Sequence, residues 1–496
     1  MTDAISSSRR PQQVTRSIRI MQAVVLALLG LRLWFDIAVP PMGDESYYWM
    51  WGQRPELSYF DHPPLHGWLL GLTEKVVGWH WWSVRALTWV CLAATLWVFW
   101  QWARRIMPDD PREYFWRTTT LYLATPIFWL MGTMAFNDYL LVALGFVSAH
   151  FFLVFLTDYE TGRRRHGALY LAAVLLGLAV LTKYNGAILG VAFAVMVLSR
   201  RKFWPLLANP HLWLAALLSI AMQAPVLLWN LNEGMASFGF HLGTRMADAS
   251  IAMANHYWLV FLANMALVLS PFFFIALFRY PFGPRPTGFE GNARLFAFAG
   301  FGSSTLVFLV VSLAVYVFFY WNIIGYLALI PVAYRYLGKR WLFWLHTAFG
   351  LGMAIVLTVN FTLFPLANLV GPKDWGTSAN FGWDELAVAM REEQSAHPDA
   401  FLAATRYTYA AQIGYQLHTS DVTSFNTLTD QYDFWTDRAA LTGRNALIIA
   451  DGAWPIDFAR SQFANATLLR IVTIHRFGQE VTSYEIWLGE DYNPTE

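Results

Sequence analysis

The stretch GDESYYWMWGQRPELSYFDHPP, residues 43–64, differs from the sequence on both sides of it. It lies between two apolar runs and holds two adjacent acidic residues, an acidic residue beside a histidine, a double proline and six aromatic rings. Each proline restricts its own backbone and that of the preceding residue, so the end of the stretch forms a stiff turn. A polar cluster directly after an apolar run is typical of the first loop outside a membrane-spanning helix.

The composition places much of the chain in lipid. Of the 496 residues, 56% are hydrophobic and 14% are charged, whereas soluble globular proteins carry roughly 25% charged residues. The net charge is +1, so the charge gives no reason to expect a nucleic-acid partner. The single cysteine, Cys91, excludes an intrachain disulfide, and we expect it to be a small buried apolar residue.

Apolar runs near membrane-spanning length recur along residues 20–364. They predict a polytopic α-helical membrane protein with about 11 spans, and at most about 13. The runs fall at 20–40, 82–103, 115–134, 139–157, 168–183, 187–199, 211–230, 257–278, 294–317, 320–337 and 341–364.

The basic residues give a consistent topology. If the spans alternate, few cations lie on one side, while most lie on the side of the N-terminal segment 1–19: Arg104, Arg105, Arg112, Arg117, Arg163, Arg164, Arg165, Arg200, Arg201, Lys202, Arg279, Arg285, Arg294, Arg335, Lys339 and Arg340. The positive-inside rule then predicts a cytoplasmic N-terminus, and in a bacterium such a protein would lie in the inner membrane. The first external loop would cover residues 41–81, and its second half is amphipathic enough to lie along the membrane surface.

After about residue 365 the apolar runs stop. Residues 365–496 mix helix-like pieces with segments such as ALIIADG and RIVTIHRFGQEVTSYEIWLG, which are typical of strands. An odd number of spans from a cytoplasmic N-terminus places this segment outside the membrane. We therefore predict a C-terminal periplasmic α/β domain.

Acidic residues in the outer loops are the first candidates for chemistry. Asp44 and Glu45 follow the first span, at the boundary where they would meet a lipid-borne substrate. The same loop supplies Tyr48, Tyr59, Asp61 and His62 as candidate substrate-binding residues. An ordinary polar loop with interfacial aromatic rings remains an equally good interpretation of this stretch alone.

The next two outer turns each contribute one charge. Asp138 is the only charged residue of an otherwise apolar hairpin, where an acid is costly and is more often functional than incidental; Asn137 or Asp138 as a cap of the following helix is the alternative. Lys183 is the only cation of the third turn. It either holds a phosphate at the lipid–water boundary or simply extends to the interface. His241 and Arg245, in the loop 231–256, are weaker candidates.

Several of these stretches resemble one family. DESYYW (44–49) and LSYFDHPPL (57–65) are similar to the first external loop of GT-C-fold glycosyltransferases of the protein O-mannosyltransferase-like superfamily. The likeness is strongest to the branch with the lipid A aminoarabinose transferase and the rhizobial lipopolysaccharide galacturonosyltransferases. LTKYN (181–185) resembles the third external turn of that family, and Asn137-Asp138 its second acidic motif. GWDEL (382–386) and QYDFW (431–435) resemble parts of its outer domain.

The resemblance implies transfer of a sugar from a polyprenyl-phosphate donor to an acceptor hydroxyl of lipid A, lipopolysaccharide core or another envelope glycan. Asp44 would be the catalytic base, Asp138 the second catalytic acid and Lys183 the donor phosphate ligand. Direct displacement with one base would invert the anomeric centre. A divalent metal is compatible with Asp44, Glu45 and Asp138 as oxygen ligands but is not required.

Other functions fit the same composition. A transporter or lipid flippase is the main alternative, although its charges usually gather near the membrane midplane. A protein O-glycosyltransferase of the same fold and a non-catalytic receptor are also open. The clustering of distinctive polar residues at one face, followed by an outer domain, favours chemistry at the membrane surface.

Overall fold

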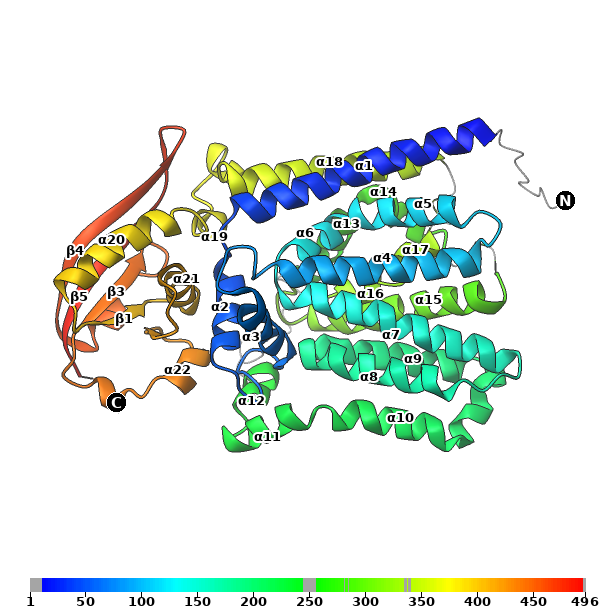
Figure 1. Cartoon of the computed structure of the whole chain (residues 1–496), viewed down its shortest axis with the longest axis horizontal. Helices are drawn as coiled ribbons and strands as arrows, with labels where there is room; N and C mark the ends of the chain where they lie inside the picture. Colours follow the sequence, from blue (N-terminus) through cyan, green and yellow to red (C-terminus); the bar gives the residue numbers. More distant parts are fainter. Residues whose placement is uncertain are drawn as a thin grey trace.

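The computed structural model describes residues 11–243, 256–280, 282–283, 285–333, 337 and 340–493. A long helical bundle occupies one part of the molecule and an α/β domain the other (Figure 1). Two short helices, α2 (Gly43–Gln53) and α3 (Leu65–Val77), lie between them. The unusual stretch 43–64 therefore lies at the junction of the two parts.

The bundle is helical almost throughout, and prolines begin several of its helices because a proline at the first helical position sacrifices no hydrogen bond. Its helices are α1 (Pro11–Ala38), α4 (Ala86–Ile106), α5 (Pro111–Leu123), α6 (Pro126–Thr133), α7 (Asn137–Glu160), α8 (His166–Thr182), α9 (Ala187–Ser199), α10 (Pro210–Ala221), α11 (Ala224–Asn232), α12 (Ala236–Leu242), α13 (Tyr257–Leu269), α14 (Pro271–Leu277), α15 (Gly288–Val311), α16 (Ile323–Tyr326), α17 (Leu329–Ala333) and α18 (Arg340–Thr362).

The predicted polytopic helical architecture is confirmed, although several runs form broken helices. Within the described residues, six helices are long and apolar enough to cross a membrane, or seven if the bent pair α13–α14 counts as one span. That pair is bent by 106°, and the run 115–134 is divided between α5 and α6 just before Pro126. Three further apolar helices are shorter. Broken and short helices thus account for the difference from about 11 predicted spans.

The two ends of the bundle differ in charge. The basic connections α4–α5, α7–α8 and α9–α10 lie at the end of the bundle away from the α/β domain (Figure 1). The start of α1 lies at that same end, whereas α2 and α3 lie at the opposite one. This arrangement agrees with the alternation of spans expected from the basic residues.

The α2–α3 pair is packed unusually closely. A Cβ at position 52 would lie 2.6 Å from the backbone nitrogen of Gly71, so only glycine permits this approach. On the side facing the α/β domain, a Cβ at position 43 would lie 2.8 Å from Cβ of Thr408. Aromatic side chains of α2, including Trp49 and Trp51, are fully buried in a core that continues into the α/β domain. Most aromatic rings of the 43–64 stretch therefore serve as packing between the two parts of the molecule.

The α/β domain contains a five-stranded sheet in the order β2-β1-β3-β5-β4. Strands β1, β2 and β3 are parallel, and the long hairpin β4–β5 pairs antiparallel with β3. The predicted strand segments correspond to β3 and to the hairpin. The elements are α19 (Trp375–Ser378), α20 (Trp383–Ala396), β1 (Phe401–Ala404), α21 (Tyr407–Leu417), β2 (Val422–Ser424), α22 (Gln431–Trp435), β3 (Ala446–Asp451), α23 (Asp457–Arg460), β4 (Phe463–Arg476) and β5 (Gln479–Tyr492).

Candidate functional site

Asp44 lies in the first turn of α2, where three cavities meet. The first, which we call the lysine cavity, has a volume of about 480 Å³ and extends toward the bundle. The second, the arginine cavity, has a volume of about 620 Å³ and extends beneath the α/β domain. A third cavity of about 360 Å³ lies against α6. Asp44 and Tyr320 line all three, so the acid at the start of α2 is accessible from each side.

The lysine cavity brings together most of the site residues predicted from the sequence. It is walled by polar side chains from three successive turns at the end of the bundle next to the α/β domain (Figure 1) and by aromatic rings of later segments. Its lining residues are Asp44, Tyr48, His62, Phe136, Asp138, Lys183, Tyr184, Asn185, Phe238, His241, Phe308, Val311, Tyr320 and Trp321. Residues up to 277 positions apart in the sequence, from Asp44 to Trp321, thus form one surface.

Lys183 and Asp138 form a buried ion pair in this cavity. The Lys183 ammonium nitrogen lies 2.9 Å from each carboxylate oxygen of Asp138, and the two residues are 6% and 1% exposed. The lysine also lies 4.7 Å from the centre of the Tyr320 ring. Lys183 therefore does not simply extend to the interface, since its charge is held inside the protein by a carboxylate.

The structure also decides the capping alternative for Asp138. Helix α7 has Phe136 at its N-cap position, and no side chain forms a hydrogen bond at that cap. Both Asp138 oxygens instead accept from Lys183. Asp138 is thus a partner of the lysine, and the interpretation of this acid as a helix cap is wrong.

Asp44 is held between the two parts of the molecule. The Tyr407 hydroxyl, at the start of α21, donates to Asp44 Oδ1 over 3.3 Å. Burial raises the pKa of the Asp44 carboxyl, while the positive charge of Arg406 and the hydrogen bond from Tyr407 partly oppose that rise. A carboxylate with a raised pKa and one hydrogen bond keeps basicity and free lone pairs, which suits it to accept a proton.

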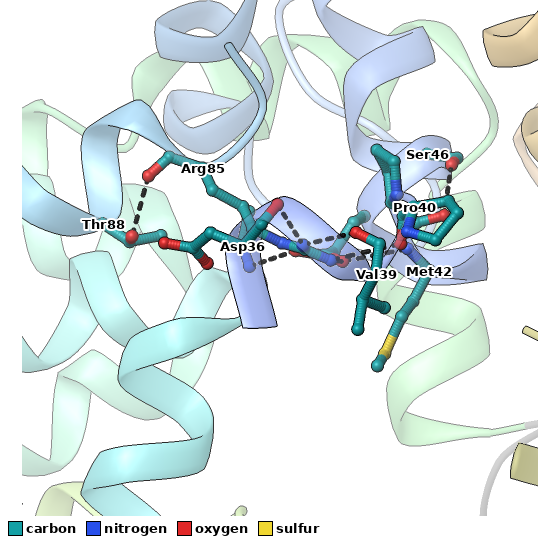
Figure 2. A network of polar contacts seen from close by, with 10 residues as sticks. Asp36, Val39, Pro40, Met42, Ser46, Arg85 and Thr88 are labelled. Atoms are coloured by element: carbon teal, nitrogen blue, oxygen red, sulfur yellow. Dashed lines mark hydrogen bonds and ion pairs between the residues drawn. The ribbon is translucent and has the colours of Figure 1, made fainter. Parts of the chain in front are cut away.

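Glu45, the adjacent acid, points away from the cavities. Its carboxylate accepts from Arg85 at 2.6 and 2.8 Å and from the backbone N–H of Ala135 at 2.6 Å. Arg85 also donates to the carbonyl of Val39, at the end of α1 (Figure 2). Glu45 is fully buried, so the structure gives it a role in fixing α1, α2 and α6 together, in place of the predicted substrate contact.

Replacing Glu45 with alanine is expected to destabilise the fold strongly. The variant leaves the buried Arg85 guanidinium without its carboxylate, which typically costs about 3–5 kcal/mol. Thermal unfolding of the purified protein in detergent measures the effect, with Glu480→Ala at an exposed position of β5 as the matched control. Equal melting temperatures of the two variants would contradict this role of Glu45.

Tyr59 also lies away from the cavities. Its ring stacks on Trp51 with centroids 4.5 Å apart, and its hydroxyl donates to the Trp51 carbonyl over 2.8 Å. The side chain is fully buried. Tyr59 therefore stabilises the turn between α2 and α3, and the predicted substrate contact does not fit its position.

Asp61, His62 and His241 gather at the boundary between the lysine and arginine cavities. The Tyr47 hydroxyl donates to Asp61 Oδ2 over 2.7 Å, and the Asp61 carbonyl lies 2.9 Å from Nε2 of His241. His62 lines both cavities. Arg245, the remaining sequence candidate, lies outside the described residues.

The sequence did not indicate the contribution of the α/β domain. Arg406, Tyr407, Asn426, Asp430 and Trp454 line the arginine cavity together with Asp44. Burial and the neighbouring charge of Asp433 raise the pKa of Asp430 to about 7. The one available signal was the QYDFW stretch, which begins directly after Asp430.

The candidate metal ligands are not assembled. In the part of the chain that the structure describes, no group of three or more His, Cys, Asp and Glu side chains is placed to hold a metal ion. Of the three acids that the sequence offered, Glu45 binds Arg85 and Asp138 binds Lys183. The residues present therefore do not fit a metal site, and no step below is assigned to one.

Comparisons with known proteins agree with this architecture. Residues 61–229 match the family model described as dolichyl-phosphate-mannose-protein mannosyltransferase. A lipid A galacturonosyltransferase, RgtD of Rhizobium johnstonii, is 26% identical over 226 residues. That alignment covers 42% of this chain and 43% of the relative, so less than half of the relative's length is matched.

Two solved structures share the whole fold. ArnT from Cupriavidus metallidurans in the apo state superposes with a TM-score of 0.62 at 15% identity, covering 95% of this chain and 98% of that one. The same protein bound to undecaprenyl phosphate gives a TM-score of 0.61 at 15% identity over the same shares. The resemblance expected from the sequence is thereby confirmed, and the chain is a polytopic membrane protein with the GT-C fold.

Proposed function

We propose that this protein is an integral-membrane glycosyltransferase that moves a sugar from a polyprenyl-phosphate donor to an acceptor hydroxyl. The observation that carries the proposal is the lysine cavity. Asp44 and the Lys183–Asp138 pair, which come from three successive outer turns, line one cavity of about 480 Å³ at the end of the bundle next to the α/β domain. Displacement of a phosphate by a hydroxyl requires a base that takes the hydroxyl proton and a cation that stabilises the phosphate, and both line this cavity.

In the proposed step, the acceptor oxygen attacks the anomeric carbon while Asp44 takes the hydroxyl proton. A new carbon–oxygen bond forms as the bond between the anomeric carbon and the donor phosphate oxygen breaks, and the electron pair leaves with the lipid phosphate. The ammonium of Lys183 stabilises the negative charge that develops there. A single displacement of this kind inverts the anomeric centre.

Asp138 has a positioning role in this scheme. Its two contacts of 2.9 Å hold the Lys183 ammonium in the cavity before a substrate arrives. A phosphate would then meet a lysine that is already placed, so less conformational entropy is lost on binding. Asp138 also keeps that buried cation paired while the site is empty of donor.

The relatives support the substrate class. One is named as a lipid A galacturonosyltransferase, and one structure of the shared fold holds undecaprenyl phosphate. We therefore favour lipid A, lipopolysaccharide core or another envelope glycan as acceptor. Segment 1–19 would be cytoplasmic, 20–364 the membrane domain and 365–496 a periplasmic domain, in a bacterial inner membrane.

The decisive test uses the full chain in proteoliposomes with a radiolabelled pool of polyprenyl-phosphate sugars and bacterial membrane lipids. We expect the label to move to a lipid or glycan product in a time-dependent manner. Label that crosses the bilayer without a change of chemical form would show a flippase. Failure to form any glycosylated product across the donor pool would overturn the proposal.

A further inference from the structure

The edge of the sheet where β1, β2 and β3 end faces Asp44. Because these three strands are parallel, their carboxyl ends lie at one edge. Arg406 follows β1, Asn426 follows β2 and Trp454 follows β3, and all three line the arginine cavity. In open α/β sheets, ligands usually bind outside the carboxyl ends of parallel strands.

Arg406 is the cation of this edge, and it is firmly positioned. Its guanidinium lies 4.2 Å from the centre of the Trp454 ring. That tryptophan is itself fixed, since its carbonyl accepts from the Thr405 hydroxyl over 2.7 Å and its backbone N–H donates to Asp451 over 2.8 Å. The guanidinium therefore lies against a fixed ring before any ligand binds.

The Arg406 side chain lacks a polar partner of its own. Among the described residues, its guanidinium forms no hydrogen bond or ion pair, and Nε is buried without a partner. Arg438 and Arg470 of the same domain, by contrast, have acidic partners: Arg438 lies 2.6 Å from Asp433, and Arg470 lies 2.6 Å from Glu392. A half-buried guanidinium without a partner is costly unless a ligand completes it.

Two acids of the arginine cavity, Asp61 and Asp430, are already engaged. Asp61 accepts from the Tyr47 hydroxyl, and Asp430 accepts from Asn426 and from the backbone N–H of Tyr432, both over 2.8 Å. Among the described residues that line this cavity, the Arg406 guanidinium is the cation without an acidic partner, and it is placed to bind an anionic ligand. Its planar fork matches two oxygens of a carboxylate or phosphate.

We propose that Arg406 binds an oxyanion, a carboxylate or a phosphate, carried by the substrate that occupies the arginine cavity beside Asp44. This inference rests on the proposed transferase function and adds its substrate class: a uronic acid as the transferred sugar, or a phosphorylated acceptor. Arg406 would then determine specificity, in a role separate from that of Lys183, which lies in the lysine cavity and is paired with Asp138.

Binding is tested first, without any need for activity. Melting of the purified full chain is followed with galacturonate, inorganic phosphate and galactose, for wild type, Arg406→Gln, Arg406→Lys and the exposed control Arg391→Gln. We expect at least one anion, and not galactose, to raise the melting temperature of wild type and the control. Arg406→Gln should lose that rise and Arg406→Lys should recover part of it. Equal responses of wild type and Arg406→Gln would overturn the site.

Sugar-transfer assays then show whether the transferred sugar or the acceptor carries the oxyanion. Polyprenyl-phosphate galactose and polyprenyl-phosphate galacturonic acid are compared on acceptor lipids with and without phosphate. If the sugar carries the oxyanion, Arg406→Gln lowers kcat/KM roughly 10- to 100-fold for the galacturonic acid donor relative to galactose. If the acceptor carries it, the loss occurs with both donors and disappears on the dephosphorylated lipid.

If Arg406→Gln lowered kcat/KM equally for all four donor–acceptor combinations, or for none of them, the assignment of Arg406 would be overturned. Anion binding that Arg406→Gln abolishes, without transfer by wild type from any donor, would support the site and contradict the transferase function. The two failures are therefore distinguishable.

Discussion

Replacing Asp44 with asparagine is expected to lower the rate of sugar transfer by roughly 10²- to 10⁴-fold, the usual contribution of a general base. Asparagine has nearly the same shape and still accepts the hydrogen bond from the Tyr407 hydroxyl. It does not take a proton from the acceptor, so the chemical step fails while the packing of α2 persists. Initial rates with a saturating lipid-linked donor measure the effect.

The pH profile provides an independent check on Asp44. Because burial raises the pKa of its carboxyl, the rate should fall as the pH drops through a value above the ordinary aspartate range, where the base becomes protonated. Asp421→Asn, at an exposed position of the α/β domain, is the matched control and should leave rate and profile unchanged. Turnover of Asp44→Asn at the wild-type rate would rule out Asp44 as the base.

Replacing Lys183 with alanine is expected to reduce kcat/KM by a factor on the order of 10² or more, the usual effect of removing a group that stabilises developing negative charge. The variant also leaves the Asp138 carboxylate buried without its cation and turned toward the donor phosphate. Lys183→Arg should recover part of the activity because it keeps the charge but changes the geometry. Rates measured against donor concentration give kcat and KM separately.

Control variants separate the effect of losing the Lys183 charge from the general effect of removing a lysine. Lys75→Ala removes an exposed lysine of α3 at the same end of the bundle and should behave as wild type. Asp138→Asn leaves the buried Lys183 cation without a carboxylate partner, so it should change donor KM and kcat and also lower the melting temperature. If the curves of rate against donor concentration overlap for Lys183→Ala and wild type, Lys183 is only the structural partner of Asp138.

The bundle could be predicted because lipid imposes a simple rule on sequence: long apolar runs separated by basic or polar turns. The breaks at Pro126 and Pro271 were not predicted, since a proline is compatible with both a continuous and a broken span until its neighbours are known. In the α/β domain, β3 and the β4–β5 hairpin followed from their residue patterns. The order of the strands did not, because pairing depends on contacts distant in sequence.

Within the site, Asp138 and Lys183 were recognisable because each is the lone charge of an apolar turn. Asp44 was recognisable because it directly follows the first span, in the stretch that carries the family resemblance. Glu45 was misjudged because consecutive residues of a helix point about 100° apart, and its partner Arg85 lies 40 residues away. Arg406 was not identified at all. In sequence it is one arginine among many, and only the arrangement of the parallel strands places it beside Asp44.

The lysine cavity and the arginine cavity share Asp44, Tyr48, His62 and Tyr320, and α12 contributes to both. Elsewhere the first is walled by the bundle and the second mainly by the α/β domain. In the proposed reaction, a substrate bound in one cavity leaves most of the other cavity open. The first substrate therefore does not have to leave before the second one binds. For the proposed sugar transfer, the two cavities predict a sequential reaction through a ternary complex of protein, donor and acceptor. A ping-pong reaction, by contrast, would store the sugar on the protein and reuse a single binding position.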